Sequence, residues 1–131
     1  MVNMKKGNLY RRNKSGICLF LGEFQQMHER VGLMYSDELG YICRSMYEMV
    51  KWWKEVGVDD SADFLRIGGA YVKADEPKFP APVPIVIKDI VVMNDVKYVV
   101  TEDGLAILAF EMVNNYKEVR SETKKFNGIK H

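Results

Sequence analysis

The apolar residues between positions 17 and 34 recur at intervals of three and four. This is the spacing of one face of an α-helix. The face consists of Ile17, Phe20, Leu21, Phe24, Met27, His28 and Val31. Gly22 costs such a helix roughly 1 kcal/mol relative to alanine, but the pattern still predicts a first helix over residues 17–34.

A second helix is predicted from the start signal Ser36-Asp37-Glu38, which offers a capping hydroxyl followed by two carboxylates in the first turn. It runs to about Val56, and Gly57 provides a left-handed stop. Tyr41 and Trp52 lie eleven residues apart, which places them together on a second face of this helix. We expect that face to associate with another copy of the chain, because exposed aromatic residues are common interface anchors.

The middle of the chain combines helix and turn signals. Asp59-Asp60-Ser61 predicts the cap of a short third helix over residues 62–67, which Gly68-Gly69 ends. Four prolines then follow within eight residues, a density that favours an extended connector. They are Pro77, Pro80, Pro82 and Pro84.

The C-terminal part is predicted to hold a β-hairpin and a final helix. Residues 85–93 and 96–100 are rich in β-branched side chains, and Asn94-Asp95 between them is a turn signal. Residues 70–73, or a second subunit, would supply a further strand. Thr101-Glu102-Asp103 precedes a helix whose apolar face runs from Leu105 to Tyr116. The expected fold is therefore α+β: an N-terminal helical pair, a short third helix, a proline-rich connector, a β-hairpin and a C-terminal helix.

Charge divides the chain into three blocks. Five basic residues precede the first acidic one, and residues 23–116 then hold 9 basic against 16 acidic residues. Residues 117–131 hold 5 basic and 2 acidic. We interpret this as a flexible basic arm (1–16), a single α+β domain (17–120) and a basic C-terminal tail (121–131). The arm is expected to bind a polyanion or a neighbouring subunit through Lys5, Lys6, Arg11, Arg12 and Lys14.

Length and composition indicate one folded domain of 131 residues and 15.1 kDa, with 47% hydrophobic residues. No apolar run approaches the length of a membrane span, and Ile17 to Leu21 is too short for a signal peptide, so we expect an intracellular protein. Cys18 and Cys43 are either core residues or one disulfide. The scarcity of Gln and Thr favours a thermophilic source, whereas eight Met argue against one.

Candidate chemistry is sparse, so we expect neither an enzyme nor a cofactor. A zinc site lacks its close ligand pair, because His28 is the only internal histidine and the cysteines lie 25 residues apart. The cluster Asp59, Asp60 and Asp63 lacks the glycine and glutamate of a calcium loop. Gly68-Gly69 lacks the lysine of a phosphate-binding loop.

One segment, from Val96 to Leu108, is similar to the end of a winged-helix domain, in which a wing strand runs into a Thr-x-x-Gly turn and a dimerising helix. That resemblance implies DNA binding. The alternative is a strand and a capped helix in some other α+β fold, because a proline-rich connector stands where the recognition helix should be.

Two functions follow from these features. The first hypothesis is a non-enzymatic, self-associating structural or assembly protein, such as a coat or virion component encoded by a virus or mobile element. The alternative is a nucleic-acid-binding protein, winged-helix-like or acting through its basic arm. The expected partners are therefore further copies of the chain, in a dimer or larger assembly, or non-specific nucleic acid, and no membrane.

Overall fold

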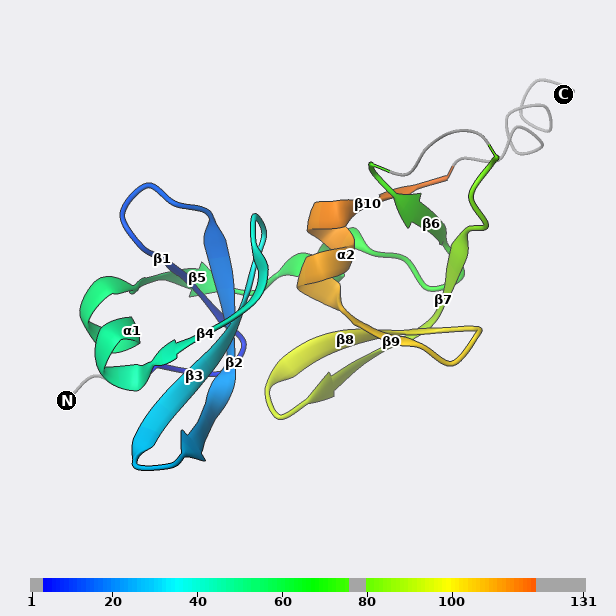
Figure 1. Cartoon of the computed structure of the whole chain (residues 1–131). Helices are drawn as coiled ribbons and strands as arrows, with labels where there is room; N and C mark the ends of the chain where they lie inside the picture. Colours follow the sequence, from blue (N-terminus) through cyan, green and yellow to red (C-terminus); the bar gives the residue numbers. More distant parts are fainter. Residues whose placement is uncertain (1–3, 76–79, 120–131) are drawn as a thin grey trace, which may run out of the picture.

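The structure is a computed structural model that describes residues 4–75 and 80–119. These residues form two five-stranded antiparallel sheets, which lie side by side as two lobes (Figure 1). A connector carrying the 3-10 helix η1 (Ser61–Phe64) joins them. The first lobe contains β1 (Asn8–Arg11), β2 (Ile17–Gln26), β3 (Glu29–Ser36), β4 (Gly40–Ser45), α1 (Met46–Trp52) and β5 (Lys54–Val58). The second contains β6 (Ala70–Lys73), β7 (Ile85–Met93), β8 (Val96–Thr101), β9 (Ala106–Leu108), α2 (Ala109–Asn115) and β10 (Tyr116–Glu118).

The two lobes have the same connectivity. The strand order is β4-β3-β2-β1-β5 in the first sheet and β9-β8-β7-β6-β10 in the second. In each, four strands form a meander, a short helix follows the fourth strand, and the fifth strand returns to pair with the first. The chain therefore contains a structural repeat. We call residues 4–58 the first repeat and residues 65–119 the second repeat.

Irregular details of the backbone recur at equivalent positions. The long hairpin of each repeat has a bulge, between Phe20 and Gly22 in β2 and between Ile87 and Asp89 in β7. Five residue pairs separate each bulge from a two-residue turn. A bulge kinks a strand at one defined place, so this agreement fixes the register in which the repeats correspond.

A buried tyrosine on the first strand marks the same equivalence. The hydroxyl of Tyr10 accepts a hydrogen bond from the backbone N–H of Lys5 at 2.8 Å. The hydroxyl of Tyr71 accepts one from the N–H of Arg66 at 3.1 Å, again five residues earlier. The glycine inside each loop has nearly the same left-handed φ, +86° at Gly7 and +87° at Gly68.

The repeat is also present in the sequence. Residues 47–56 read YEMVKWWKEV and residues 110–119 read FEMVNNYKEV, so six of ten positions are identical. The shared methionine, Met49 or Met112, is fully buried under its helix in both repeats. The shared Glu55 and Glu118 each pair with the core tyrosine of their own sheet, Tyr10 and Tyr71.

Three hydrophobic clusters form the core. One lies within each repeat, and the third lies at the contact between them. In this third cluster the ring of Phe110 on α2 packs edge-on against Tyr35 on β3, with centroids 6.2 Å apart. Asn115 Nδ2 donates to the Tyr35 hydroxyl at 2.7 Å. As a result, α2 lies between the lobes whereas α1 lies at the outer end of the first (Figure 1).

The predicted helical pair is wrong, and the fold is mostly β. Residues 17–34 form β2 and most of β3 instead of a helix. The cause is that β2 is buried on both faces: Phe20 contributes to the core of the first repeat, and Leu19 contributes to the contact between repeats. A strand buried on both faces has a continuous run of apolar residues. It therefore lacks the alternation of apolar and polar residues that would identify it as a strand.

The predicted second helix is divided among three elements. Ser36 caps a tight turn, its hydroxyl accepting from the N–H groups of Glu38 and Leu39 at 3.1 Å each, and β4 follows. Ser45 is the actual N-cap, its side chain accepting from the N–H of Glu48. The helix has only seven residues because Trp53 is extended and leads into β5.

Predictions for the second half are closer to the structure. The hairpin around Asn94-Asp95 is confirmed, and residues 70–73 supply the neighbouring strand β6. The third helix is a four-residue 3-10 turn, Ser61–Phe64. The final helix begins at Ala109, because Thr101 caps a turn by accepting from the N–H of Leu105 at 2.9 Å and β9 follows.

The boundaries expected for the arm and the domain do not match the sheets. Residues 8–11 were expected in a flexible arm, but they form β1 in the interior of the first sheet, where Tyr10 is only 3% exposed. The proline-rich connector lies within the second repeat, between β6 and β7, instead of between a helical and a β half. Residues 76–79 of the connector and the tail at 121–131 lie outside the described residues.

The two loop glycines provide a test of the packing between repeats. Gly68→Ala should cost about 1–2 kcal/mol of unfolding free energy, because alanine is strained at this φ although the space around it is empty. Gly7→Ala should cost clearly more, because its new methyl group would also collide with the carbonyl oxygen of Asp95 from the second repeat. Urea unfolding of both full-length variants measures the difference. Equal costs would show that the Asp95 turn is not held against Gly7.

Candidate functional site

The outer helix α1 carries an exposed row of aromatic and cationic side chains. Trp52 is 44% exposed and Tyr47 is 79% exposed. The guanidinium of Arg12, from the β1–β2 loop, lies 5.6 Å from the ring centre of Trp52. The ammonium of Lys51 lies 5.3 Å from the same ring and 5.8 Å from that of Tyr47. We call these four residues the α1 ridge.

Local sequence explains why the ridge faces solvent. Met46 and Met49 are buried, so the opposite side of this short helix points outward. Tyr47 and Lys51 lie four residues apart and are neighbours on that side. Distances of 5–6 Å between a cation and an aromatic ring are those of cation–π interactions, worth about 0.5–1 kcal/mol at exposed sites. The ridge is therefore ordered by its own contacts.

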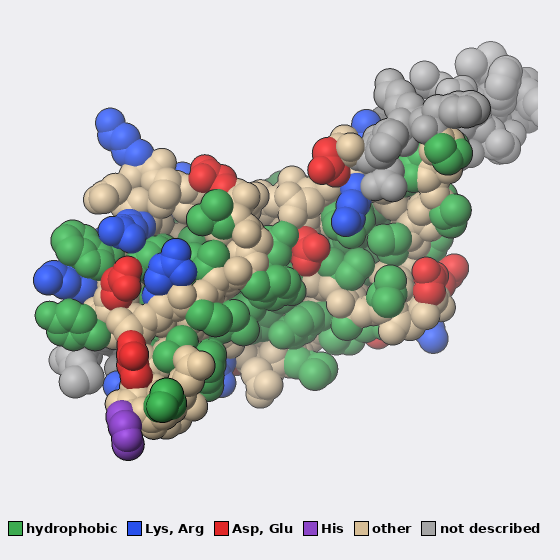
Figure 2. All heavy atoms as spheres, viewed as in Figure 1, with side chains coloured by type: hydrophobic (Ala, Val, Ile, Leu, Met, Phe, Trp, Pro, Cys, Tyr) green, Lys and Arg blue, Asp and Glu red, His purple; other side chains and the backbone are tan. Residues whose placement is uncertain are grey.

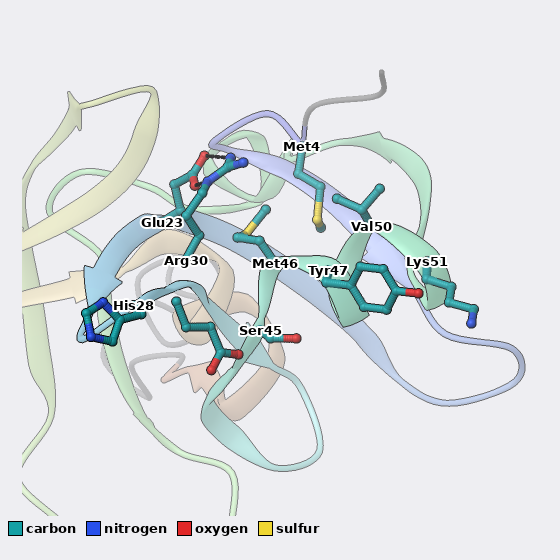
Figure 3. Close-up of a pocket in the computed structure, with 10 residues that line it drawn as sticks. Met4, Glu23, His28, Arg30, Ser45, Met46, Tyr47, Val50 and Lys51 are labelled. Atoms are coloured by element: carbon teal, nitrogen blue, oxygen red, sulfur yellow. Dashed lines mark hydrogen bonds and ion pairs between the residues drawn. The ribbon is translucent and has the colours of Figure 1, made fainter.

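A groove of about 840 Å³ lies beside the ridge. Its apolar wall is formed by Met4, Met46, Val50 and the ring of Tyr47 (Figure 3). The opposite wall belongs to the β2–β3 hairpin, where Arg30 forms a two-point ion pair with Glu23 at 2.6 and 2.7 Å. This pairing lowers the pKa of the Glu23 carboxyl and raises that of Arg30.

Charge is segregated between the repeats. Residues 1–58 contain nine Lys and Arg against six Asp and Glu, whereas residues 59–119 contain six against eleven. Figure 2 shows Lys and Arg side chains gathered with hydrophobic ones over the end of the first repeat that carries α1. The first repeat is basic because the five cations of residues 5–14 fold as part of it, whereas the connector and the second repeat are acidic.

The structure brings together one member of each predicted set. Arg12, predicted to bind polyanions, contacts Trp52, predicted to mediate self-association. Tyr41 does not join them, because it lies on β4, 59% exposed, with its ring 4.9 Å from that of Tyr35. Lys5, Lys6, Arg11 and Lys14 are exposed on the loops and strand around β1.

Tyr47 and Lys51 were missed as site residues. The helix carrying them was predicted to begin about ten residues too early, so its faces were assigned wrongly. The repeated motif would have located them: residues 47–56 align with 110–119, and Lys51-Trp52 stands where the second repeat has Asn114-Asn115. That pair is an obvious difference inside an otherwise shared segment.

The remaining chemical candidates lie apart from one another. His28 is at the tip of the β2–β3 turn, at the far end of the groove from the methionines (Figure 3). Cys18 is buried, Cys43 is exposed on β4, and both are free thiols. Burial raises the pKa of the Cys18 thiol, which disfavours its nucleophilic thiolate form. Within residues 4–75 and 80–119, no three His, Cys, Asp or Glu side chains are grouped to hold a metal ion.

The shared helix glutamate has a different environment in each repeat. Glu48 lies 4.0 Å from Arg12, and both side chains are partly exposed, so the pair contributes little stability. Glu111 is partly buried beside the contact between repeats, and this desolvation raises the pKa of its carboxyl above the usual 4.5. Folding therefore favours its protonated form.

No protein-family model, curated protein or solved structure matches this chain. Among the described residues, no helix is long and apolar enough to cross a membrane.

Glu111→Gln should stabilise the protein relative to wild type increasingly as pH rises. A carboxyl whose pKa is raised by folding contributes stability at pH values below its ordinary pKa. This contribution is lost as the pH rises through the pKa of the folded state. Unfolding free energies at several pH values between about 4 and 7 would show a widening gap in favour of the variant. Glu48→Gln, at the equivalent and partly exposed position of the first repeat, is the matched control. A gap that narrows with pH would contradict the assignment.

Proposed function

We propose that the first repeat binds single-stranded nucleic acid through the α1 ridge. The observation that carries the proposal is the exposed ring of Trp52, which has the cationic groups of Arg12 and Lys51 within 5.6 Å of its centre. Bases can stack on exposed aromatic rings, and neighbouring cations can bind the phosphates that link those bases. Tyr47 provides a second exposed ring next to Lys51.

The shape of the ridge favours a single strand over a duplex. An α-helix that recognises duplex DNA lies in the major groove and presents several side chains along its length to the base edges. Here α1 has seven residues, and the ridge residues come from its outer side and from one loop. Stacking also requires bases that are free to leave a helix, as in a single strand. The winged-helix alternative is not retained, because a meander of strands precedes α2 and Phe110 of α2 is buried at the contact between the repeats.

Binding is expected in the first repeat alone. The second repeat has Asn114 and Asn115 where the first has Lys51 and Trp52. In addition, Phe110, the counterpart of Tyr47, is only 6% exposed. The acidic excess of residues 59–119 would also repel phosphates. Lys5, Lys6, Arg11 and Lys14 surround β1 of the first repeat, and we propose that they extend the electrostatic contact.

The other expectations stay predictions. A non-enzymatic role is consistent with the proposal, and an origin in a virus or mobile element is not required by it. Self-association through surfaces outside the ridge is compatible with nucleic-acid binding.

The double variant Lys51→Asn, Trp52→Asn tests the proposal, because it gives α1 the pair that α2 already carries. The fold should be retained. Loss of one stacked base costs about 1–3 kcal/mol, so the dissociation constant for a labelled thymidine oligonucleotide should rise roughly 5- to 150-fold. Loss of one phosphate contact should lower the slope of log affinity against log salt by about 0.7. Fluorescence anisotropy over a salt series measures both.

Lys88→Asn, Phe64→Asn is the matched control, since it removes one exposed cation and one exposed ring from the connector and second repeat. It should leave oligonucleotide affinity unchanged or only slightly lower, because one distant positive charge is lost. Absence of wild-type binding at low salt, or equal losses in the two double variants, would refute the proposed function.

A further inference from the structure

The docking surface of the second repeat is already occupied inside the molecule. Val96, Leu108 and Phe110 form this surface, and the sheet of the first repeat covers it with Leu19 and Tyr35. All five side chains are at least nine-tenths buried. The contact therefore shows how the helix side of one repeat packs on the sheet side of another.

The equivalent surface of the first repeat is uncovered. By the register of the hairpins and helices, Val96, Leu108 and Phe110 correspond to the following residues: Glu29, Ser45 and Tyr47. These three line the groove beside α1, where Figure 3 labels Ser45 and Tyr47. Tyr47 is 79% exposed, whereas Phe110 is 6% exposed. The groove is thus the counterpart of a surface that this fold uses for docking.

The second repeat also offers the matching sheet side. The residues equivalent to Leu19, Leu21 and Tyr35 are Val86, Lys88 and Glu102. Lys88 and Glu102 are exposed, and Val86 is partly exposed. Another repeat placed here would therefore cover Val86 together with one charge of each sign.

The substitutions on the two free surfaces compensate each other. Inside the molecule, Phe110 packs on Tyr35. The equivalent pair between two copies would be Tyr47 and Glu102, in which the phenol can donate a hydrogen bond to the carboxylate. Val96 belongs to a cluster against which Leu21 packs. The equivalent pair is Glu29 and Lys88, which have opposite charges.

We infer that the partner of the α1 groove is a second copy of this chain, which docks the sheet side of its second repeat there. The overall charges agree, because a basic first repeat would meet the acidic second repeat of its neighbour. The contact joins two different surfaces, so it is head-to-tail and leaves one of each surface free. Successive copies then form a short linear assembly, or a closed ring where the rotation between neighbours divides a full turn evenly. This inference does not depend on nucleic-acid binding, and the two activities would compete for Tyr47, which belongs both to the ridge and to the groove.

Sedimentation of the full-length protein without nucleic acid, from micromolar to near-millimolar concentration, is the first measurement. The average mass should rise with concentration beyond that of two copies. Tyr47→Asp places a carboxylate opposite Glu102, and Glu102→Ala removes the acceptor of the Tyr47 hydroxyl. Both positions are exposed, so folding should be unaffected. Each variant alone should weaken association at least about tenfold.

A mixture of these two variants distinguishes head-to-tail docking from a two-fold dimer. Tyr47→Asp blocks only the groove, and Glu102→Ala weakens only the sheet side without offering a partner to the new carboxylate, so one wild-type contact remains between unlike copies. Equimolar mixing should restore a species of two copies and no larger one.

Charge reversal provides the rescue. Glu29→Lys and Lys88→Glu should each weaken association, and the chain carrying both changes should recover it. A wild-type chain that stays monomeric at near-millimolar concentration would overturn the inference. Association that is unchanged in both single variants, at positions 47 and 102, would also overturn it. Wild-type association that stops at two copies would overturn it as well.

Discussion

The packing of α2 against the sheet of the first repeat is the constraint on which the rest of the molecule depends. Phe110 and Leu108 cover Leu19 and Tyr35, so β2 acquires a second buried face. Without this cover, the sheet side of the first repeat would expose an apolar surface, and such surfaces are typical of interaction sites. The same contact places Asp95 against Gly7 and brings Lys97 Nζ to the Asp59 carbonyl oxygen at 2.6 Å. Because this contact covers Phe110 on α2, α1 is the helix whose aromatic side chains remain exposed to a ligand.

How much of the fold the sequence predicts depends on how local its signals are. The β7–β8 hairpin is predictable because Asn94 and Asp95 tolerate the positive φ values, 51° and 66°, that its turn requires. The equivalent turn in the first repeat contains Met27, with φ of 56°, and His28, neither of which is a turn signal. Two strands therefore read as one helix. Long-range burial, in this case of β2, cannot be inferred from spacing alone.

The candidate site is partly predictable for a different reason. Arg12 stands out by charge and Trp52 by its large exposed ring, and both enter the ridge although they were assigned to different surfaces. Their contact could not be foreseen, because it requires the β1–β2 loop to lie beside α1. The prediction that groups Tyr41 with Trp52 fails because the two residues share a face only if residues 41–52 form one helix. Comparing residues 47–56 with 110–119 avoids that assumption.

Because the two repeats share a scaffold, their comparison separates structure from function within one chain. Two of the identical pairs have clear structural roles: Met49 and Met112 fill the core, and Glu55 and Glu118 lie opposite the core tyrosine on the closing strand. Substituting them would leave a cavity or disturb the closing strand. Lys51-Trp52 and Asn114-Asn115, however, occupy the same place on equally folded helices, so the fold accepts either pair. The difference must therefore reflect what each helix meets: Asn115 bonds to Tyr35 inside the molecule, whereas Trp52 is left exposed with a cation near its ring.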